Sequence, residues 1–334
     1  MLFFLKDNKK EFILWLNVPK VTAYNYKIAM DIISIINYKG GVGKTTLTTN
    51  IAGDLALLGY KVLMIDLDPQ ASLTFSFLKP DEWKEKVADK HTIKNWFSDS
   101  KKIRTKRFED LIITPHTVKD SLKNKGKLDL VSSHLELINV DLELATKLGG
   151  ANMTQAKEQF IKVHHRLLDG INQLPDDAYD IILIDCPPNF NIVTKNAIVA
   201  SDYILIPAKP DYLSTMGIDY LKNSLDKLVK EYNEYVSIED SDLDDYEPIN
   251  PQILGVVFTM VQYYGEKPIS ALRPFIAQTK QLGFDVFEDT LRENKTLFAD
   301  AAQYGVPVVI SKRNSGINVI DGINGIVKEL LNKL

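Results

Sequence analysis

The chain has 334 residues, a net charge of −4 and a hydrophobic fraction of 45%, the balance of a globular protein with room for one large α/β domain or two small ones. The charge excludes an overall basic surface, so any binding of nucleic acid needs a local patch. Because Cys186 is the single cysteine, the chain forms no disulfide or cysteine cluster within itself, and we expect a reducing, cytoplasmic location.

Residues 1–30 are predicted to form an extension ahead of the main domain. Its apolar start is interrupted at once by Lys6 and Asp7, and the next apolar piece, Phe12–Leu16, is too short for a signal segment or a membrane span. The extension is also too short for an independent DNA-binding domain. We therefore expect a single domain over residues 31–334, with no transmembrane segment.

A strand, a loop, a helix and a second strand follow in order. The β-branched run Ile32–Ile36 is typical of a strand buried on both faces. After a glycine-rich loop, apolar residues recur at helical spacing from Leu47 to Leu58, and Gly59 is well placed to end that helix. Lys61–Asp66 is the next strand. The pattern predicts a βαβ unit with a parallel pair of strands.

The rest of the chain continues the alternation of strands and helices. Apolar runs at 128–131, 181–184, 203–206 and 253–258 predict further strands, with helical segments between them. We expect residues 80–127 to form short helices and loops over the sheet. The acidic segment Glu231–Pro251 is expected to be a solvent-exposed excursion between a helix and a strand. The pattern indicates an α/β fold: a doubly wound, mostly parallel sheet with helices on both faces.

The glycine-rich loop between the first strand and the first helix predicts a phosphate-binding site. Such a loop directs backbone N–H groups and the positive end of the helix dipole at one point. Lys44 can reach the β- and γ-phosphates of ATP, Thr45 can bind Mg²⁺, and Thr46 can add a phosphate contact. The loop consists of Lys39, Gly40, Gly41, Val42, Gly43, Lys44, Thr45 and Thr46.

Two carboxylate motifs lie at strand ends, where a doubly wound sheet binds its ligand. They are Asp66-Leu67-Asp68-Pro69-Gln70 and Asp185-Cys186-Pro187-Pro188. Asp185, at the end of a buried strand, is suited to hold Mg²⁺ through water. Asp68 lies past its strand and is free to orient an attacking water, while Asp66 supports either the metal site or the loop.

These motifs resemble the deviant Walker A, A′ and B motifs of ParA-type partition ATPases in the ParA/MinD superfamily. The matching segments are Lys39–Thr46, Ile65–Ser72 and Ile184–Pro188. One departure from a plain P-loop is Tyr38, which stands where that pattern has glycine. The resemblance continues at 128–133, 206–213, 287–309 and 312–316, so it covers the chain from about Asp31 to Leu334.

The resemblance implies a homodimer that sandwiches ATP and Mg²⁺ between its subunits. In that arrangement Lys39 is the signature lysine, which reaches the partner's nucleotide and acts together with Lys44 and Asp68 in hydrolysis. A second cation at the γ-phosphate favours dimerisation and stabilises the charge of the transition state. By position in the family pattern, the candidates for the adenine pocket are Pro207, Thr259 and Met260.

The resemblance also implies that the ATP-bound dimer binds DNA without sequence preference, which places it on the nucleoid, and that a ParB-like centromere-binding protein stimulates hydrolysis. Basic residues on the C-terminal side provide salt-sensitive phosphate contacts. Some relatives carry an arginine where this chain has Tyr263 and Tyr264, which puts one such contact in doubt. The candidate DNA contacts are Lys267, Arg273, Arg292, Lys295, Lys312 and Arg313.

Three other functions are compatible with the same loop. A MinD-like ATPase binds membranes through a basic amphipathic tail, but the last predicted helix, Ile317–Leu334, follows on from the domain without a linker, which favours packing on the sheet. A ParA-like ATPase that positions a protein cargo is a second alternative. A nucleotide-gated binding protein without enzymatic activity is a third.

Overall fold

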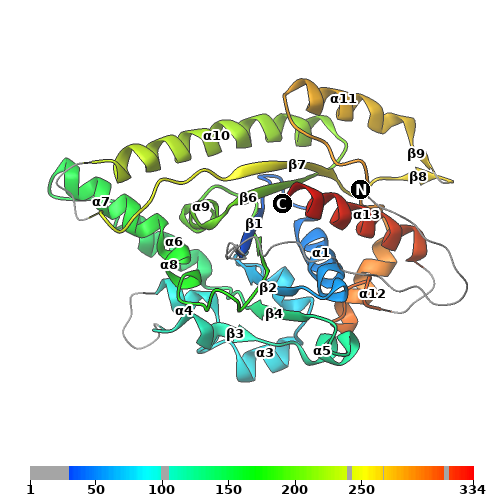
Figure 1. The fold of residues 1–334 in the computed structure, drawn as a ribbon, viewed down its shortest axis with the longest axis horizontal. Coiled ribbons are helices and arrows are strands. Elements are labelled where there is room, and N and C mark those ends of the chain that lie inside the picture. Colours follow the sequence, from blue (N-terminus) through cyan, green and yellow to red (C-terminus); the bar gives the residue numbers. More distant parts are fainter. Residues whose placement is uncertain (1–29, 99–104, 239–242, 266, 312–315) are drawn as a thin grey trace, which may run out of the picture.

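The computed structural model describes residues 30–98, 105–238, 243–265, 267–311 and 316–334. Within these residues, one sheet has seven strands in the order β3, β4, β2, β5, β1, β6, β7 (Figure 1), and only β3 runs antiparallel to its neighbour. The predicted fold class is therefore confirmed. The strands of the sheet are β1 (Asp31–Ile35), β2 (Lys61–Asp66), β3 (Ile112–Ile113), β4 (Lys127–Val131), β5 (Ile181–Asp185), β6 (Tyr203–Ala208) and β7 (Gln252–Phe258).

Helices cover both faces of this sheet, and a small hairpin follows β7 (Figure 1). One face carries α1 (Lys44–Leu58), α2 (Ser72–Phe75), α5 (His116–Leu122), α12 (Lys295–Tyr304) and α13 (Ile317–Lys333). The other carries α4 (Ile93–Phe97), α6 (Leu137–Ala145), α7 (Met153–His164), α8 (Arg166–Ile171), α9 (Ile192–Ala200), α10 (Tyr212–Val236) and α11 (Arg273–Gln281). The remaining short elements are α3 (Pro80–Lys86), the 3-10 turns Phe108–Leu111 and Ser270–Leu272, and the hairpin strands β8 (Tyr263–Tyr264) and β9 (Lys267–Pro268).

The strand pattern explains why two layers of helices form. In β1, Ile33 and Ile35 belong to the core cluster around α1, whereas Ile32 belongs to the cluster on the opposite face. Successive side chains of a strand point to opposite faces, and here both directions are apolar. Each face of the sheet therefore buries its own set of helices.

The helix after the phosphate loop ends as the sequence predicts. Gly59 adopts a φ of 107°, a left-handed conformation that costs glycine little, and its N–H bonds back to Ala56 and Leu55. Leu47 is fully buried, as its spacing predicts, but Leu58 is 59% exposed. Leu58, the last residue of α1, lies on the solvent side of the final turn.

Two expectations need correction. Glu231 and the residues up to Val236 continue α10, and Leu243 is buried against Tyr232, so the segment Glu231–Pro251 is only partly a solvated excursion. Apolar residues at helical spacing extend the helix into a segment that its acidic composition had assigned to solvent. The edge strand β3 also lies inside residues 80–127, where we expected only helices and loops.

The C-terminal helix packs against the sheet, as expected. Its apolar residues Ile323, Ile326, Val327 and Leu330 are fully buried in the cluster that includes α1. Among the residues described, no helix is long and apolar enough to cross a membrane. Residues 1–29 of the predicted extension, and the basic pair Lys312 and Arg313, lie outside the described residues.

Candidate nucleotide-binding site

The phosphate loop lies at the carboxyl end of β1, in the middle of the sheet between β5 and β6. Gly41 and Gly43 adopt φ values of 69° and 80°, a region that favours glycine, and Gly43 caps the N-terminus of α1. A helix that starts here presents its unpaired N–H groups and positive dipole end to the loop. The local geometry is that of an anion site.

Lys44 is the buried cation of this loop. Its ammonium donates to the backbone carbonyls of Asn37 (3.2 Å) and Lys39 (3.4 Å), and the residue is only 7% exposed. Burial lowers the pKa of Lys44, while the nearby Asp185 opposes that shift. Both acceptors are neutral carbonyls, so the charge of Lys44 is available to an anion bound in the loop.

Two of the three predicted Mg²⁺ ligands, Thr45 and Asp185, lie side by side. The Thr45 hydroxyl donates to Asp185 Oδ2 at 2.6 Å, and Thr48 Oγ1 lies 3.5 Å from the other oxygen of the same carboxylate. A hydroxyl and one buried carboxylate suit Mg²⁺, which binds hard oxygen ligands and takes the rest from phosphate and water. No group of three or more His, Cys, Asp or Glu side chains that could hold a metal ion occurs in the described residues.

Asp66 supports the loop that carries Asp68. Its carboxylate accepts from the backbone and hydroxyl of Thr74 (2.8 and 2.7 Å) and from the backbone of Asp68 (3.1 Å). Of the two roles expected for Asp66, these bonds fit loop support better than metal binding. Asp68 itself is partly exposed, and its carbonyl is held by the Ser133 hydroxyl at 2.7 Å.

Two acidic side chains are buried next to each other in the sheet. Asp66 and Asp185 are partners in the register of β2 and β5. Burial, reinforced by the charge of Asp185, raises the pKa of Asp66. Burial also raises the pKa of Asp185, against the hydrogen bond from Thr45 and the charge of Lys44. A cation beside this pair would stabilise both carboxylates.

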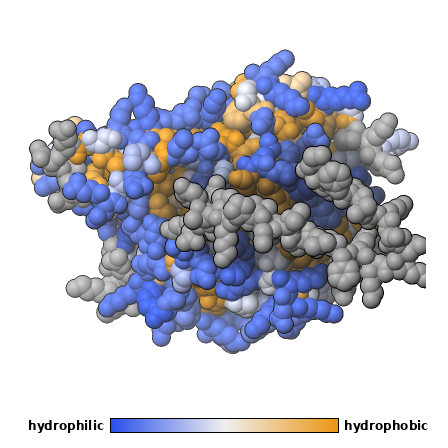
Figure 2. Space-filling model, viewed as in Figure 1, coloured by the Kyte–Doolittle hydropathy of each residue, from blue (hydrophilic) through white to orange (hydrophobic). Residues whose placement is uncertain are grey.

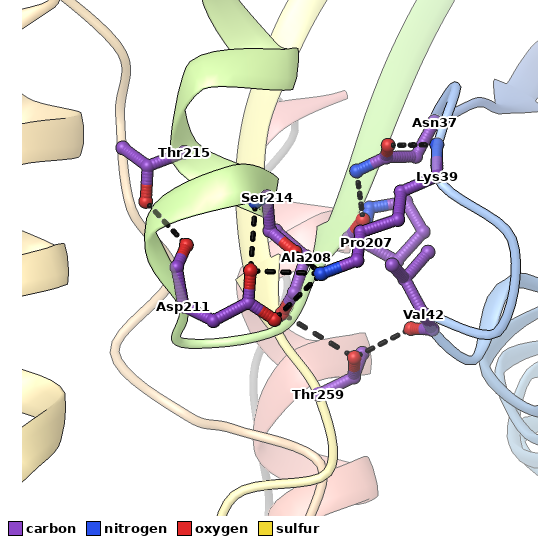
Figure 3. Close-up of polar contacts among 9 residues, drawn as sticks. All are labelled: Asn37, Lys39, Val42, Pro207, Ala208, Asp211, Ser214, Thr215 and Thr259. Carbon is purple, nitrogen blue, oxygen red and sulfur yellow. Dashed lines mark hydrogen bonds and ion pairs between the residues drawn. The ribbon is translucent and has the colours of Figure 1, made fainter.

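Two polar residues hold the loop to neighbouring strands (Figure 3): Asn37, which the sequence analysis missed, and Thr259, which it named only as an adenine candidate. Asn37 Nδ2 donates to the carbonyl of Pro207 in β6 at 2.8 Å, and its Oδ1 accepts from the backbone of Lys39 at 2.8 Å. Thr259 Oγ1 donates to the carbonyl of Val42 at 2.5 Å. Asn37 follows a buried strand directly, the one sequence signal that pointed to it.

The adenine candidates lie behind the loop. Pro207 and Thr259 are buried, and Met260 adopts a left-handed φ of 53° just after β7. A side chain added at Gly43 would lie within 3.7 Å of both Thr259 and Met260. Thr259 and Met260 are therefore adjacent to the loop, and contact of the three candidates with adenine stays a prediction.

Lys39 does not point at the loop's own anion site. Its ammonium lies 2.8 Å from both carboxylate oxygens of Asp211 and 3.2 Å from the hydroxyl of Ser214 (Figure 3). Asp211 is the N-cap of α10 and was not among the predicted site residues. Its signal in the sequence was an acidic residue directly before a helical run, which is a common capping pattern.

Only some of the candidate DNA-binding residues lie close to one another. Arg292 stacks on Tyr263, with its guanidinium carbon 3.7 Å from the ring centroid, and Lys267 pairs with Tyr264 in the β8–β9 hairpin. Lys295 lies 3.5 Å from Glu293 and is highly exposed, and Arg273 starts α11 on the surface. Arg292 thus lies beside Tyr263, one of the two tyrosines at the position where the sequence analysis put a contact in doubt.

Comparison with known proteins identifies the family. A family model described as an AAA domain matches residues 30–238, which include the phosphate loop, both carboxylate motifs and Asp211. The sporulation initiation inhibitor protein Soj of Bacillus subtilis is 28% identical over 86% of this chain and 94% of its own length. The chain belongs to the ParA/MinD-type P-loop ATPases. A protein of Methanocaldococcus jannaschii is 33% identical over 76% of this chain and 80% of its own length.

Solved structures share the fold of this ParA/MinD-type chain at lower identity. McdA from Cyanothece matches with a TM-score of 0.64 and 20% identity over 90% of this chain and 99% of its own. A putative plasmid partition protein of Borrelia burgdorferi, solved with AMPPNP, matches with a TM-score of 0.62 and 23% identity over 91% and 100%. A cobyrinic acid a,c-diamide synthase of Mycobacterium smegmatis, solved with an ATP analogue and magnesium, matches with a TM-score of 0.64 and 19% identity. The match covers 91% of this chain and 94% of the synthase. One fold therefore serves several activities, and function has to be argued from the site.

Proposed function

We propose that this chain is a DNA-partition ATPase that hydrolyses ATP as a sandwich dimer. The observation that carries the proposal is the second lysine of the phosphate loop: Lys39 points away from its own anion site, while Lys44 fills it. A lysine placed this way has no role at its own nucleotide. It suits contact with a nucleotide held by a second copy of the chain.

The chain's own residues account for the steps of hydrolysis. Lys44 and the N-terminus of α1 would hold the phosphates, and Thr45 and Asp185 would hold Mg²⁺, which would neutralise charge on the phosphate oxygens. Asp68, fixed at its backbone by Asp66 and Ser133, orients the attacking water. Lys39 of the second subunit stabilises the charge that develops in the transition state. Catalysis here rests on positioning and charge.

An exposed apolar surface beside Lys39 supports dimerisation. Tyr212, Leu213 and Met216, in the first turns of α10, are 60%, 68% and 52% exposed. Figure 2 shows hydrophobic patches in the band where α10 and α11 run, above a mainly hydrophilic lower half. Exposed apolar side chains close together in the chain favour an interaction site. Because this surface adjoins Asp211 and Lys39, we assign it to the second subunit.

We propose that the ATP-bound dimer binds the DNA of the nucleoid. Arg292 stacks on Tyr263 of the β8–β9 hairpin, and Lys295, three residues further along the chain, is exposed. Such cationic and aromatic groups bind the phosphate backbone without reading sequence. A membrane role has less support, since the apolar residues of α13 are buried in the core. A ParB-like protein completes the proposal as the partner that stimulates hydrolysis.

Sedimentation velocity, with and without ATP and Mg²⁺, tests the dimer, and fluorescence anisotropy with a random-sequence duplex tests the DNA. We expect a monomer without nucleotide, and with ATP a dimer that binds the duplex with an affinity that falls steeply as salt rises. Lys44→Ala should bind no ATP and remain monomeric. Binding of the ATP form to anionic liposomes rather than DNA would favour the MinD-like function, and binding to neither would favour a protein cargo.

A further inference from the structure

The ion pair between Lys39 and Asp211 uses the full hydrogen-bonding capacity of the lysine. An ammonium has three N–H donors, and Lys39 has three acceptors within reach: both oxygens of Asp211 and the Ser214 hydroxyl. The side chains of Lys39 and Asp211 are 32% and 40% exposed. Lys39 therefore cannot bind a further phosphate without giving up a contact it already makes.

Asp211 is held in place independently of Lys39 (Figure 3). Its Oδ1 accepts from the backbone N–H of Ser214 at 2.8 Å, and its carbonyl accepts from the Thr215 hydroxyl at 3.1 Å. These bonds cap α10, so the carboxylate stays at the mouth of the loop whether or not the lysine is present. Burial alone would raise the pKa of Asp211, but the bonds from Lys39 and Ser214 outweigh it and hold the pKa below its usual value.

We propose that Asp211 is a positioning residue that holds Lys39 on its own subunit until a second subunit presents its nucleotide. This inference rests on the proposed function, in which Lys39 acts on the partner's ATP. Asp211 then competes with the partner's γ-phosphate for the same ammonium. The competition sets the concentration of protein and ATP at which dimers form, and it keeps Lys39 away from its own nucleotide in the monomer.

Asp211→Asn tests the competition directly. Asparagine is as good an N-cap as aspartate, so the start of α10 is retained while the negative charge is removed. A partly exposed ion pair is worth about a threefold to fivefold change in an equilibrium constant. Two such pairs open in each dimer, so we expect the dimer Kd, measured by sedimentation with Mg²⁺ and a non-hydrolysable ATP analogue, to fall about tenfold. The affinity of the monomer for the analogue should not change.

The same substitution made in the Lys39→Ala chain shows whether its effect on the dimer Kd depends on Lys39. In the Lys39→Ala chain, Asp211→Asn should leave the protein monomeric, and dimers there would overturn the proposal because charge removal would then act without the lysine. A dimer Kd that is unchanged or raised by Asp211→Asn in the natural chain would overturn it as well. Should Asp211→Asn fold poorly, Ser214→Ala removes one acceptor of Lys39, keeps the backbone cap bond, and should lower the dimer Kd about twofold.

The proposed function and this inference fail in different ways. A natural chain that stays monomeric with the analogue at every concentration removes the sandwich dimer and the competition with it. A natural chain that dimerises, with Asp211→Asn showing the same dimer Kd, leaves the dimer intact and removes only the role of Asp211.

Discussion

The substitution Thr259→Val removes the hydrogen bond that Thr259 makes to the phosphate loop and keeps the shape of the side chain. Thr259 is fully buried, and its hydroxyl donates to the carbonyl of Val42 at 2.5 Å and to that of Ala208 at 3.3 Å. Valine has nearly the same shape and no donor. A buried carbonyl that loses its partner costs about 1–3 kcal/mol, so the free energy of unfolding should fall by about that amount.

The same substitution should weaken ATP binding, because Val42 lies inside the phosphate loop. If the loop loses its fixed conformation, a cost of about 1.4 kcal/mol appears as a tenfold rise in Kd. Urea denaturation and calorimetric titration with a non-hydrolysable analogue measure the two effects. Thr259→Ser keeps the hydroxyl and is the matched control. Equal stability and equal affinity in the two variants would refute the role given to this hydrogen bond.

Three further predictions concern hydrolysis, DNA and pH. Asp68→Ala should accumulate an ATP-bound dimer in size exclusion, and hydrolysis at the natural rate would contradict its role. Arg292→Ala should weaken binding to random-sequence DNA and lower the slope of log affinity against log salt by about 1. An unchanged slope would show that Arg292 does not contact DNA. Burial lowers the pKa of His164 to about 4, so the unfolded chain binds the extra proton and stability falls as pH drops from about 6.5 towards 4. Between pH 7 and 5, the free energy of unfolding of His164→Gln should therefore fall by about 2 kcal/mol less than that of the natural chain. In the exposed control His116→Gln, the free energy of unfolding should fall by as much as in the natural chain.

The parts of the site that the sequence predicted are those fixed by local chemistry. The glycines, Lys44 and Thr45 lie on one turn between a strand and a helix, so their spacing determines their geometry. Asp185 ends a run of apolar residues, and the end of a buried parallel strand is where such a sheet binds its ligand. The mostly parallel sheet and its two helical layers followed from the alternation of strands and helices.

The parts that were missed depend on contacts between distant segments. Asn37 bonds to Pro207, and Lys39 to Asp211, only because β6 lies next to β1 in the sheet. Strand order is a property of the whole fold, and no local pattern around Asp211 points to a lysine 172 positions earlier. The edge strand β3 was missed for a similar reason: Ile112 and Ile113 become a strand by pairing with β4.

The central claim is that Lys39 acts on the nucleotide of a second subunit. Its most direct test is to measure ATP affinity, dimerisation and hydrolysis in Lys39→Ala. The account predicts ATP binding at the natural affinity, since Lys44 holds the chain's own phosphates, together with a monomer in the presence of ATP and Mg²⁺ and a loss of hydrolysis. A Lys39→Ala protein that dimerises with ATP and hydrolyses it at the natural rate would contradict the claim.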